Sequence, residues 1–323
     1  MFNPEKNWFK LTVTIKNSVI PAIMPRVILC TTLGIAISLF DYHDWPIVSE
    51  VFNYFIFPDL VLGLLLVFRT NTAYDRFWEG RKLWGTLVNT VRNFARQIWL
   101  MVPEKDINDT NNKIATLKLL VAFAVATKLH LRKEKVNAEI EALMSSEQYV
   151  KLQTMNHPPL EIAFWIGDYL QAQNKQHHLH IYQLTALYKL LDTMVDVLGG
   201  CERISKTPLP LAYQIHLQQI LLIYCLILPL KIVSNLGLFT GLIVAIMTFT
   251  LLGIEEIARQ IENPFGYDEN DIQLDTICQA MLKNIQDLIS LPPSVQTYEQ
   301  EIKSKLNDIA AAKEFRTPTD SET

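Results

Sequence analysis

The chain has 323 residues, of which half are hydrophobic and 19% are charged. Its mean hydropathy of +0.15 excludes an ordinary soluble domain, and its charged fraction excludes a chain wholly embedded in lipid. The formal net charge of −4 gives no support to a nucleic-acid partner. The four scattered cysteines, without CxxC spacing, favour free thiols over disulfides or a zinc site. We therefore expect a membrane domain joined to a sizeable helical soluble part.

The N-terminal segment, residues 1–17, is basic and amphipathic, and we expect no signal peptide because no small-residue cleavage site follows the first apolar run. Four stretches are candidates to span a bilayer, which requires about 20 apolar residues. They cover residues 18–40, 51–68, 211–230 and 236–257. No helix breaker separates the second stretch from the amphipathic run FRTNTAYDRFWEGRKLWG. The sequence therefore predicts one helix that leaves the bilayer and continues into water.

The distribution of basic residues predicts the orientation. Lys6, Lys10 and Lys16 precede the first span, and Arg69 and Arg76 follow the second. The connection between these two spans, DYHDWPIVSE, carries acidic residues and no lysine or arginine. We therefore expect a multi-pass membrane protein with both termini and the region 69–210 in the cytoplasm.

The cytosolic region 69–210 has helical patterns and almost no strand signals, which predicts an all-α membrane protein. Three helices are expected within it, at residues 115–131, 160–173 and 184–198. We expect the last of these to end at Gly199-Gly200, since glycine relieves a left-handed cap. After the last span, residues 258–323 are predicted to form a turn, a helix at 271–290 and a loose tail. No internal repeat supports an inverted-repeat transporter.

The second span carries a regular apolar pattern. Ile56, Leu60 and Leu64 recur every four residues, so they lie on one stripe of a helix. If several second spans surround an axis, this stripe forms stacked apolar rings that gate a pore by dewetting. Ordinary helix packing explains the same spacing, and the pattern alone does not decide between the two.

Asp59 lies within the same span, where a carboxylate costs a few kcal/mol unless it faces water or a partner. It is a candidate for ion selectivity if it faces the pore, and a structural polar contact otherwise. Arg26 of the first span is a conceivable partner. By residue count, however, Arg26 lies nearer the inner face and Asp59 nearer the outer face.

The turn after Asn263-Pro264 is rich in acidic residues, including Asp268, Asp271 and Asp275. Carboxylates and main-chain carbonyls in a turn can hold Ca²⁺, although the pattern is not an EF-hand. The same acids also suit the N-cap and first turn of the next helix. No GxSxG, HExxH, P-loop or GxGxxG motif is present, so an enzyme is disfavoured.

Three segments carry a family resemblance: residues 68–97, GGCERISKTPLPLAY (199–213) and EEIARQIENPFGYDENDIQLD (255–275). In this order they resemble the bacterial branch of the bestrophin family, and the resemblance covers almost the whole chain. It implies a homopentameric channel with four membrane helices per subunit, whose second helices line a neck. It also implies a cytosolic helical region that encloses a vestibule with a lower aperture.

Carried over position by position, the resemblance places the neck at Ile56, Leu60 and Leu64 and the lower aperture near Ile181. The Ca²⁺ clasp of animal members corresponds to Asp268 and Asp271, with Gln260 and Asn263 as carbonyl donors. The neck differs from animal members, because aliphatic rings lack the positive aromatic edge that favours anions. The acidic cluster is also interrupted, by Glu269-Asn270.

We therefore predict a channel for small monovalent ions, with its own copies, membrane lipid and those ions as partners. Chloride is the ion that the family implies, whereas Asp59 favours sodium or potassium. Two alternatives stay open from the sequence. A secondary transporter requires coupled, saturable flux, and a non-conducting scaffold or sensor requires an oligomer without flux.

Overall fold

The computed structural model describes Ile15, residues 18–43 and 57–291, and four residues between 302 and 306. Within these residues it is helical, with no strand. The chain divides into two compact units. The first comprises residues 1–87, 127–135 and 193–274, and the second comprises residues 88–126, 136–192 and 275–323.

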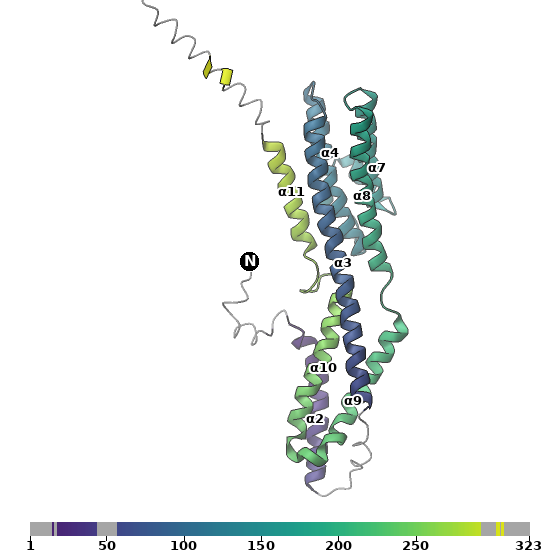
Figure 1. Cartoon of the computed structure of the whole chain (residues 1–323), viewed down its shortest axis with the longest axis vertical. Helices are drawn as coiled ribbons and strands as arrows, with labels where there is room; N and C mark the ends of the chain where they lie inside the picture. The colour runs from purple at the N-terminus through teal and green to yellow at the C-terminus, as the bar shows by residue number, and fades with distance from the viewer. Residues whose placement is uncertain (1–14, 16–17, 44–56, 292–301, 304, 307–323) are drawn as a thin grey trace, which may run out of the picture. The chain divides into compact units, whose positions relative to one another are not determined.

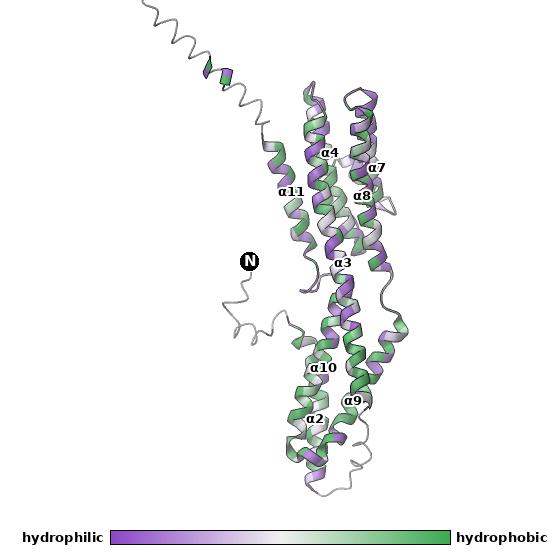
Figure 2. Ribbon diagram, viewed as in Figure 1, coloured by the Kyte–Doolittle hydropathy of each residue, from purple (hydrophilic) through white to green (hydrophobic). Residues whose placement is uncertain are grey.

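The first unit is built on three apolar helices, drawn mostly green in Figure 2. Helix α2 (Ile20–Tyr42) packs against α10 (Thr240–Glu262) and α9 (Leu211–Leu236). A short 3-10 turn, Gly237–Phe239, joins α9 to α10. Gly237 ends α9 with φ +49° and ψ −124°, a conformation that glycine adopts without steric cost. The tight reversal therefore places α9 and α10 side by side.

The first part of α3 (Phe57–Met101) completes the core of this unit. Apolar side chains from one face each of α2, α3, α9 and α10 are buried together there, because contact between these faces removes apolar surface from water. The buried members are Ile23, Val27, Cys30, Leu62, Leu66, Leu217, Leu221, Cys225, Leu228, Val244 and Leu252.

Helices α2 and α10 approach closely at two glycines. A Cβ atom added at Gly34 would lie 3.4 Å from the Cα atom of Gly241. A Cβ atom added at Gly241 would lie 2.6 Å from Cγ1 of Ile35, closer than two carbon atoms can pack. Small residues at such contacts allow the backbones of membrane helices to approach each other.

We expect Gly241→Ala to destabilise the protein by about 1–3 kcal/mol, because the added methyl group overpacks a β-branched neighbour. Gly199→Ala in α8 is the matched control. A Cβ atom there meets nothing within 4 Å, so alanine is expected to stabilise the helix by about 0.5–1 kcal/mol. Thermal unfolding of the two purified variants measures both effects. Equal shifts would show that the α2–α10 contact tolerates a side chain.

The second unit contains the remainder of α3, most of α4 (Ile107–Leu131), and α7 (Pro158–Lys175). It also contains the short helices Ala138–Glu141 (α5) and Ser146–Gln153 (α6), the start of α8 (Ile181–Lys206), and α11 (Leu274–Ser290). Helices α7 and α8 meet where the Tyr188 hydroxyl donates a hydrogen bond to the carbonyl of Gly167, at 3.0 Å.

Three helical stretches are long and apolar enough to cross a membrane: Ile20–Tyr42, Ile107–Leu131 and the continuous Leu211–Glu262. The α4 stretch differs from the other two in its burial. In α4, 78% of the most apolar window is buried, whereas in each of the other two stretches 33% of that window is buried. A helix covered on all sides is a core helix. Helix α4 is therefore packed as a core helix, and the assignment of the spans stays a prediction.

The structure confirms the predicted continuous second helix, since α3 runs without interruption over 45 residues (Figure 1). The predicted end of α8 at Gly199-Gly200 is wrong, because the helix continues to Lys206. Its buried face extends through Leu198 and Cys201. Packing of that face outweighs a glycine cost of about 1 kcal/mol per residue. Helix α11 begins at Leu274 and not at Asp271, whose backbone is held in the preceding turn.

Candidate pore-lining helix and its supporting charges

Helix α3 buries one face in the first unit. Leu62, Leu66, Arg69 and Ala73 follow each other at intervals of three or four residues, and all four are buried. Leu60 and Leu64 are each about 200° around the helix from Leu62. Their exposed fractions are 74% and 54%.

The predicted apolar stripe is therefore directed away from the subunit's own core. Ile56, its third predicted member, lies outside the described residues. An uncovered apolar stripe requires another copy, lipid or a narrow pore to cover it. The assignment of Leu60 and Leu64 to a neck stays a prediction that their exposure supports.

Asp59 forms an ion pair with Lys231 of α9, within the same subunit. Apolar side chains surround this pair, and together they line a cavity of about 180 Å³ with Ile220, Tyr224 and Ile227. Arg26 is not the partner of Asp59. The extension of α9 to Leu236, beyond its predicted end at residue 230, brings Lys231 into the helix and beside Asp59. The negative charge that the sequence places near the neck is thus balanced locally.

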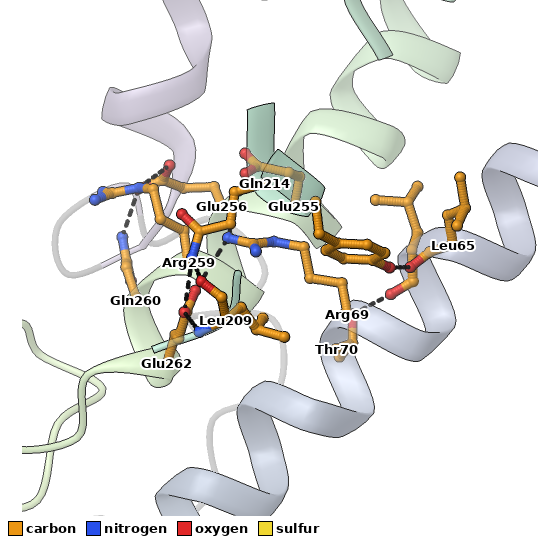
Figure 3. A network of polar contacts seen from close by, with 12 residues as sticks. Leu65, Arg69, Thr70, Leu209, Gln214, Glu255, Glu256, Arg259, Gln260 and Glu262 are labelled. Atoms are coloured by element: carbon orange, nitrogen blue, oxygen red, sulfur yellow. Dashed lines mark hydrogen bonds and ion pairs between the residues drawn. The ribbon is translucent and has the colours of Figure 1, made fainter. Parts of the chain in front are cut away.

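Arg69 is the charged centre of the α3–α10 contact, as Figure 3 shows. It follows the apolar part of α3 directly, and its side chain is 2% exposed. Its Nη2 atom lies 3.8 Å from Oε1 of Glu255 and 3.3 Å from Oε2 of Glu262, both on α10. A buried charge requires such partners, because the desolvation cost of an isolated ion is several kcal/mol. The pairs therefore join α3 to α10.

The same carboxylate of Glu262 also holds the start of α9. Its Oε1 atom accepts hydrogen bonds from the Leu209 amide at 3.1 Å and from Nε2 of Gln214 at 2.9 Å. Nearby on α10, Glu256 accepts two bonds from Arg259, at 2.9 and 2.5 Å, and one from Gln260 at 3.1 Å (Figure 3). Polar contacts therefore connect α3, α9 and α10 where their apolar segments end.

No motif in the sequence predicts a role for Glu255 or Glu262, and Arg69 there indicates only the orientation of the second span. The detectable signal was ionisable residues directly adjoining apolar helical runs, in VFRTN and GIEEIARQIE. Such residues are costly to bury and usually have partners. Which acid meets which base depends on helix packing that no local pattern contains.

The acidic turn after α10 is centred on Asp271, whose side chain is buried. Its Oδ2 atom accepts a hydrogen bond from the Asp268 amide at 2.8 Å, and its own amide donates to the Asp268 carbonyl at 2.9 Å. Its Oδ1 atom is buried and accepts no hydrogen bond from the described residues. Burial, opposed in part by the Asp268 amide and Arg132, raises the pKa of the Asp271 carboxyl to about 6.

The predicted Ca²⁺ ligands therefore lie in or beside one turn. Asp268 and Asn263 are exposed. Gln260 lies in the last turn of α10, where helix carbonyls lack an intrahelical donor. A buried carboxylate oxygen that accepts no hydrogen bond from the described residues, beside main-chain carbonyls at a helix end, is the type of donor set that Ca²⁺ takes, so the residues fit this ion. Binding of Ca²⁺ stays a prediction.

Ile181, the predicted lower aperture, is the first residue of α8 and belongs to the second unit. Its exposed fraction is 55%, and the following Tyr182 is also exposed. An apolar helix start in water is available for contact with another copy. The assignment of Ile181 to a lower aperture stays a prediction.

Comparisons with known proteins give the same family over nearly the whole chain. The family model described as Bacterial/Fungal Bestrophin protein matches residues 1–287. A voltage-dependent anion channel-forming protein of Nostoc sp. is 55% identical over 295 residues, which cover 91% of this chain and 96% of that protein. A protein of the same description from Synechocystis sp. is 54% identical over 286 residues, covering 88% and 93%.

Solved structures agree with these sequence matches. A crystal structure of a bacterial bestrophin homolog from Klebsiella pneumoniae is similar, with a TM-score of 0.75 and 27% sequence identity. The similarity covers 84% of this chain and 100% of that one. The all-helical membrane fold, the family model and the close relatives together show that this chain belongs to the bacterial and fungal bestrophin family.

Proposed function

We propose that the chain is an anion channel subunit of a bacterial inner membrane. The observation that carries this proposal is the geometry of α3. One face is anchored in the subunit by Leu62, Leu66 and Arg69, while Leu60 and Leu64 are exposed on another. A helix of this kind is suited to line a pore between several copies. The names of the Nostoc and Synechocystis relatives support anions as the permeant class.

In the proposed assembly, five copies place their α3 helices around one axis. Each copy spans the bilayer with α2, the start of α3, α9 and α10, and both termini lie in the cytoplasm. Apolar rings at Ile56, Leu60 and Leu64 keep the neck narrow and resist its hydration, and flanking charges bias which ion enters. No catalytic step is proposed. The work of the protein is selection and gating of small monovalent ions.

The proposal is tested by the reversal potential of the purified protein in planar bilayers under a KCl gradient. We expect a reversal potential near the chloride equilibrium potential. A value near the potassium equilibrium potential would make the protein a cation channel of the same architecture. Verified reconstitution of an oligomer without flux would favour a membrane scaffold or sensor.

Asp59 and Lys231 allow a reciprocal test of the charge near the neck. Asp59→Asn removes the negative charge beside Lys231 and is expected to shift selectivity toward anions, whereas Lys231→Gln is expected to shift it toward cations. The double variant, which removes both charges, is expected to return close to the wild-type reversal potential. Shifts in the same direction for both single variants would contradict this role of the pair.

We also propose that Ca²⁺ binds the turn after α10 through Asp268 and Asp271, with carbonyls of Gln260 and Asn263. The ion would supply positive charge that links the turn to the end of α10. We expect Ca²⁺ to raise the Tm of the wild type by about 2–4 °C at tenfold excess over its Kd. Asp271→Asn should abolish this shift, and Asp275→Asn, one turn further on, should retain it. A shift that survives Asp271→Asn would exclude this site.

A further inference from the structure

Arg26 is a charged residue within the apolar helix α2, and its contacts differ from those of Arg69. It is exposed, and it forms no hydrogen bond or ion pair with any residue that the structure describes. Its charge acts on Glu256, but that carboxylate is already paired with Arg259. A charge within a membrane-spanning helix is costly unless it meets water or a partner. The guanidinium of Arg26 is therefore available to a ligand.

Arg26 lines a cavity of about 210 Å³ that α2, α9 and α10 form within the first unit. The other two polar residues of its lining are Gln218 on α9 and Glu255 on α10. From the rise of a helix, Arg26 and Gln218 lie about 9–11 Å from the starts of α2 and α9, and Glu255 lies as far from the end of α10. The three polar groups therefore lie at a similar depth in their helices.

Glu255 is the buried acid of this cavity. The residue is 1% exposed, and its Oε1 atom accepts no hydrogen bond from the described residues. Its ion-pair partner is Nη2 of Arg69, which lies 3.8 Å from this atom but 3.3 Å from Oε2 of Glu262. Two buried carboxylates thus share one guanidinium. A buried carboxylate requires a cation or hydrogen-bond donors, so a cationic donor on the cavity side would complete the site.

The rest of the cavity wall is apolar. It consists of leucines and two thiols: Leu29, Cys30, Leu221, Leu222, Cys225 and Leu252. Leu29 and Leu222 are 57% and 54% exposed on the apolar surfaces of α2 and α9, where lipid covers a membrane-spanning helix. The cavity is smaller than the roughly 300–1,000 Å³ of sites that enclose a drug-sized ligand. It therefore has room for a head group, while the acyl chains stay in the surrounding lipid.

We propose that this cavity binds the zwitterionic head group of an aminophospholipid, with its ammonium group at Glu255 and its phosphate group at Arg26. An ammonium group carries three N–H donors, which suit a buried carboxylate oxygen. An arginine fork matches two phosphate oxygens. The site rests on the orientation proposed above, in which these helix ends lie at the cytosolic headgroup layer. Basic pockets between membrane helices bind lipid head groups at that level.

Three variants test the two charged contacts. Arg26→Gln removes the charge at the phosphate, and Arg26→Lys keeps the charge but loses the fork. Glu255→Gln removes the charge at the ammonium group. Because Glu255 also contacts Arg69, the two variants of the exposed Arg26 carry the test if Glu255→Gln does not fold. Arg81→Gln, at an exposed position of α3 beyond its apolar segment, is the charge-matched control.

The first measurement is thermal unfolding of the purified full-length protein in neutral detergent, titrated with phosphatidylethanolamine, phosphatidylglycerol or phosphatidylcholine. Phosphatidylglycerol has the phosphate without an ammonium group, and the ammonium group of phosphatidylcholine has no N–H donor. We expect a saturable rise in Tm that is largest for phosphatidylethanolamine. Its apparent affinity should be roughly tenfold weaker in Arg26→Gln, intermediate in Arg26→Lys and unchanged in Arg81→Gln.

Soluble phosphoethanolamine, which carries the same charges without acyl chains, is expected to leave Tm unchanged at the concentration where the lipid saturates. An equal effect of this probe would overturn the assignment to a lipid.

The second measurement is native mass spectrometry of the protein after exposure to equal amounts of phosphatidylethanolamine and phosphatidylglycerol. We expect the wild type to retain more phosphatidylethanolamine, and Glu255→Gln to lose this preference. Equal retention of both lipids by the wild type, or the same retention in Arg26→Gln as in Arg81→Gln, would overturn the proposal. Bilayer currents of the same proteins test the channel function separately. A conducting protein without lipid preference overturns only the lipid site, and a lipid preference without flux overturns only the channel.

Discussion

Replacing Arg69 by glutamine is expected to destabilise the protein by about 3–5 kcal/mol, the cost typical of breaking a buried ion pair. The change leaves Glu255 and Glu262 buried without a cation of their own, and glutamine supplies no charge to balance them. Because Glu262 also holds the start of α9, the loss extends to the contact among α3, α9 and α10.

The matched control is Arg203→Gln, which breaks another arginine–glutamate pair of the first unit. Arg203 lies 2.5 Å from Glu79, but its side chain is 66% exposed and that of Glu79 is 42% exposed. Exposed pairs contribute about 0–1 kcal/mol. Thermal and denaturant unfolding in the same detergent compare the two variants. Similar losses in both would show that burial of Arg69 does not govern its contribution.

A further variant distinguishes charge from shape. Arg69→Lys retains a cation at the site but has a single compact donor group instead of a planar fork. We expect it to recover part of the lost stability. If Arg69→Lys is as unstable as Arg69→Gln, the geometry of the guanidinium, and not its charge, is the decisive property.

Replacing Leu60 and Leu64 by alanine is expected to increase the single-channel conductance severalfold, with the double variant above either single variant. Each substitution widens an apolar ring and lowers the barrier to hydration of the neck. Both side chains are exposed in the subunit, so truncation removes little of the subunit's own packing. The expected effect is therefore on flux and not on folding.

Leu222→Ala is the control for this experiment. Leu222 lies on α9, and its exposed fraction, 54%, equals that of Leu64. The substitution removes the same atoms from another apolar helix surface. Planar-bilayer recordings of the wild type and the four variants at one voltage and salt concentration give the comparison. Unchanged currents in both single variants and the double variant would remove these leucines from the gate.

The continuous α3 helix was predictable from the sequence because its signal is local. Apolar residues pass into an amphipathic pattern at one helical period, and no breaker intervenes. The apolar stretches that form α2, α9 and α10 were predictable for the same reason. The ends of the helices were less predictable. Helix α9 extends past the predicted residue 230 to Leu236, and α8 continues through two glycines.

The assignment of the pore-lining residues depends on both the sequence and the tertiary structure. The four-residue spacing in the second span identified Leu60 and Leu64 as one stripe, but two faces of an apolar helix look alike in sequence. Burial of Leu62, Leu66 and Arg69 shows which face of α3 packs against the rest of its own subunit. For Asp59, the sequence showed a costly carboxylate and left its partner open.

The sequence by itself determined the helical class, the apolar segments and the family, because periodicity, composition and motif order are properties of short stretches of chain. The tertiary structure alone decided the charge pairs. Asp59 meets Lys231, 172 positions away, and Arg69 meets two acids of α10. Such pairs depend on which helices lie side by side and on their rotation about their own axes. Both are set by the packing of many apolar side chains at once, which no local pattern records.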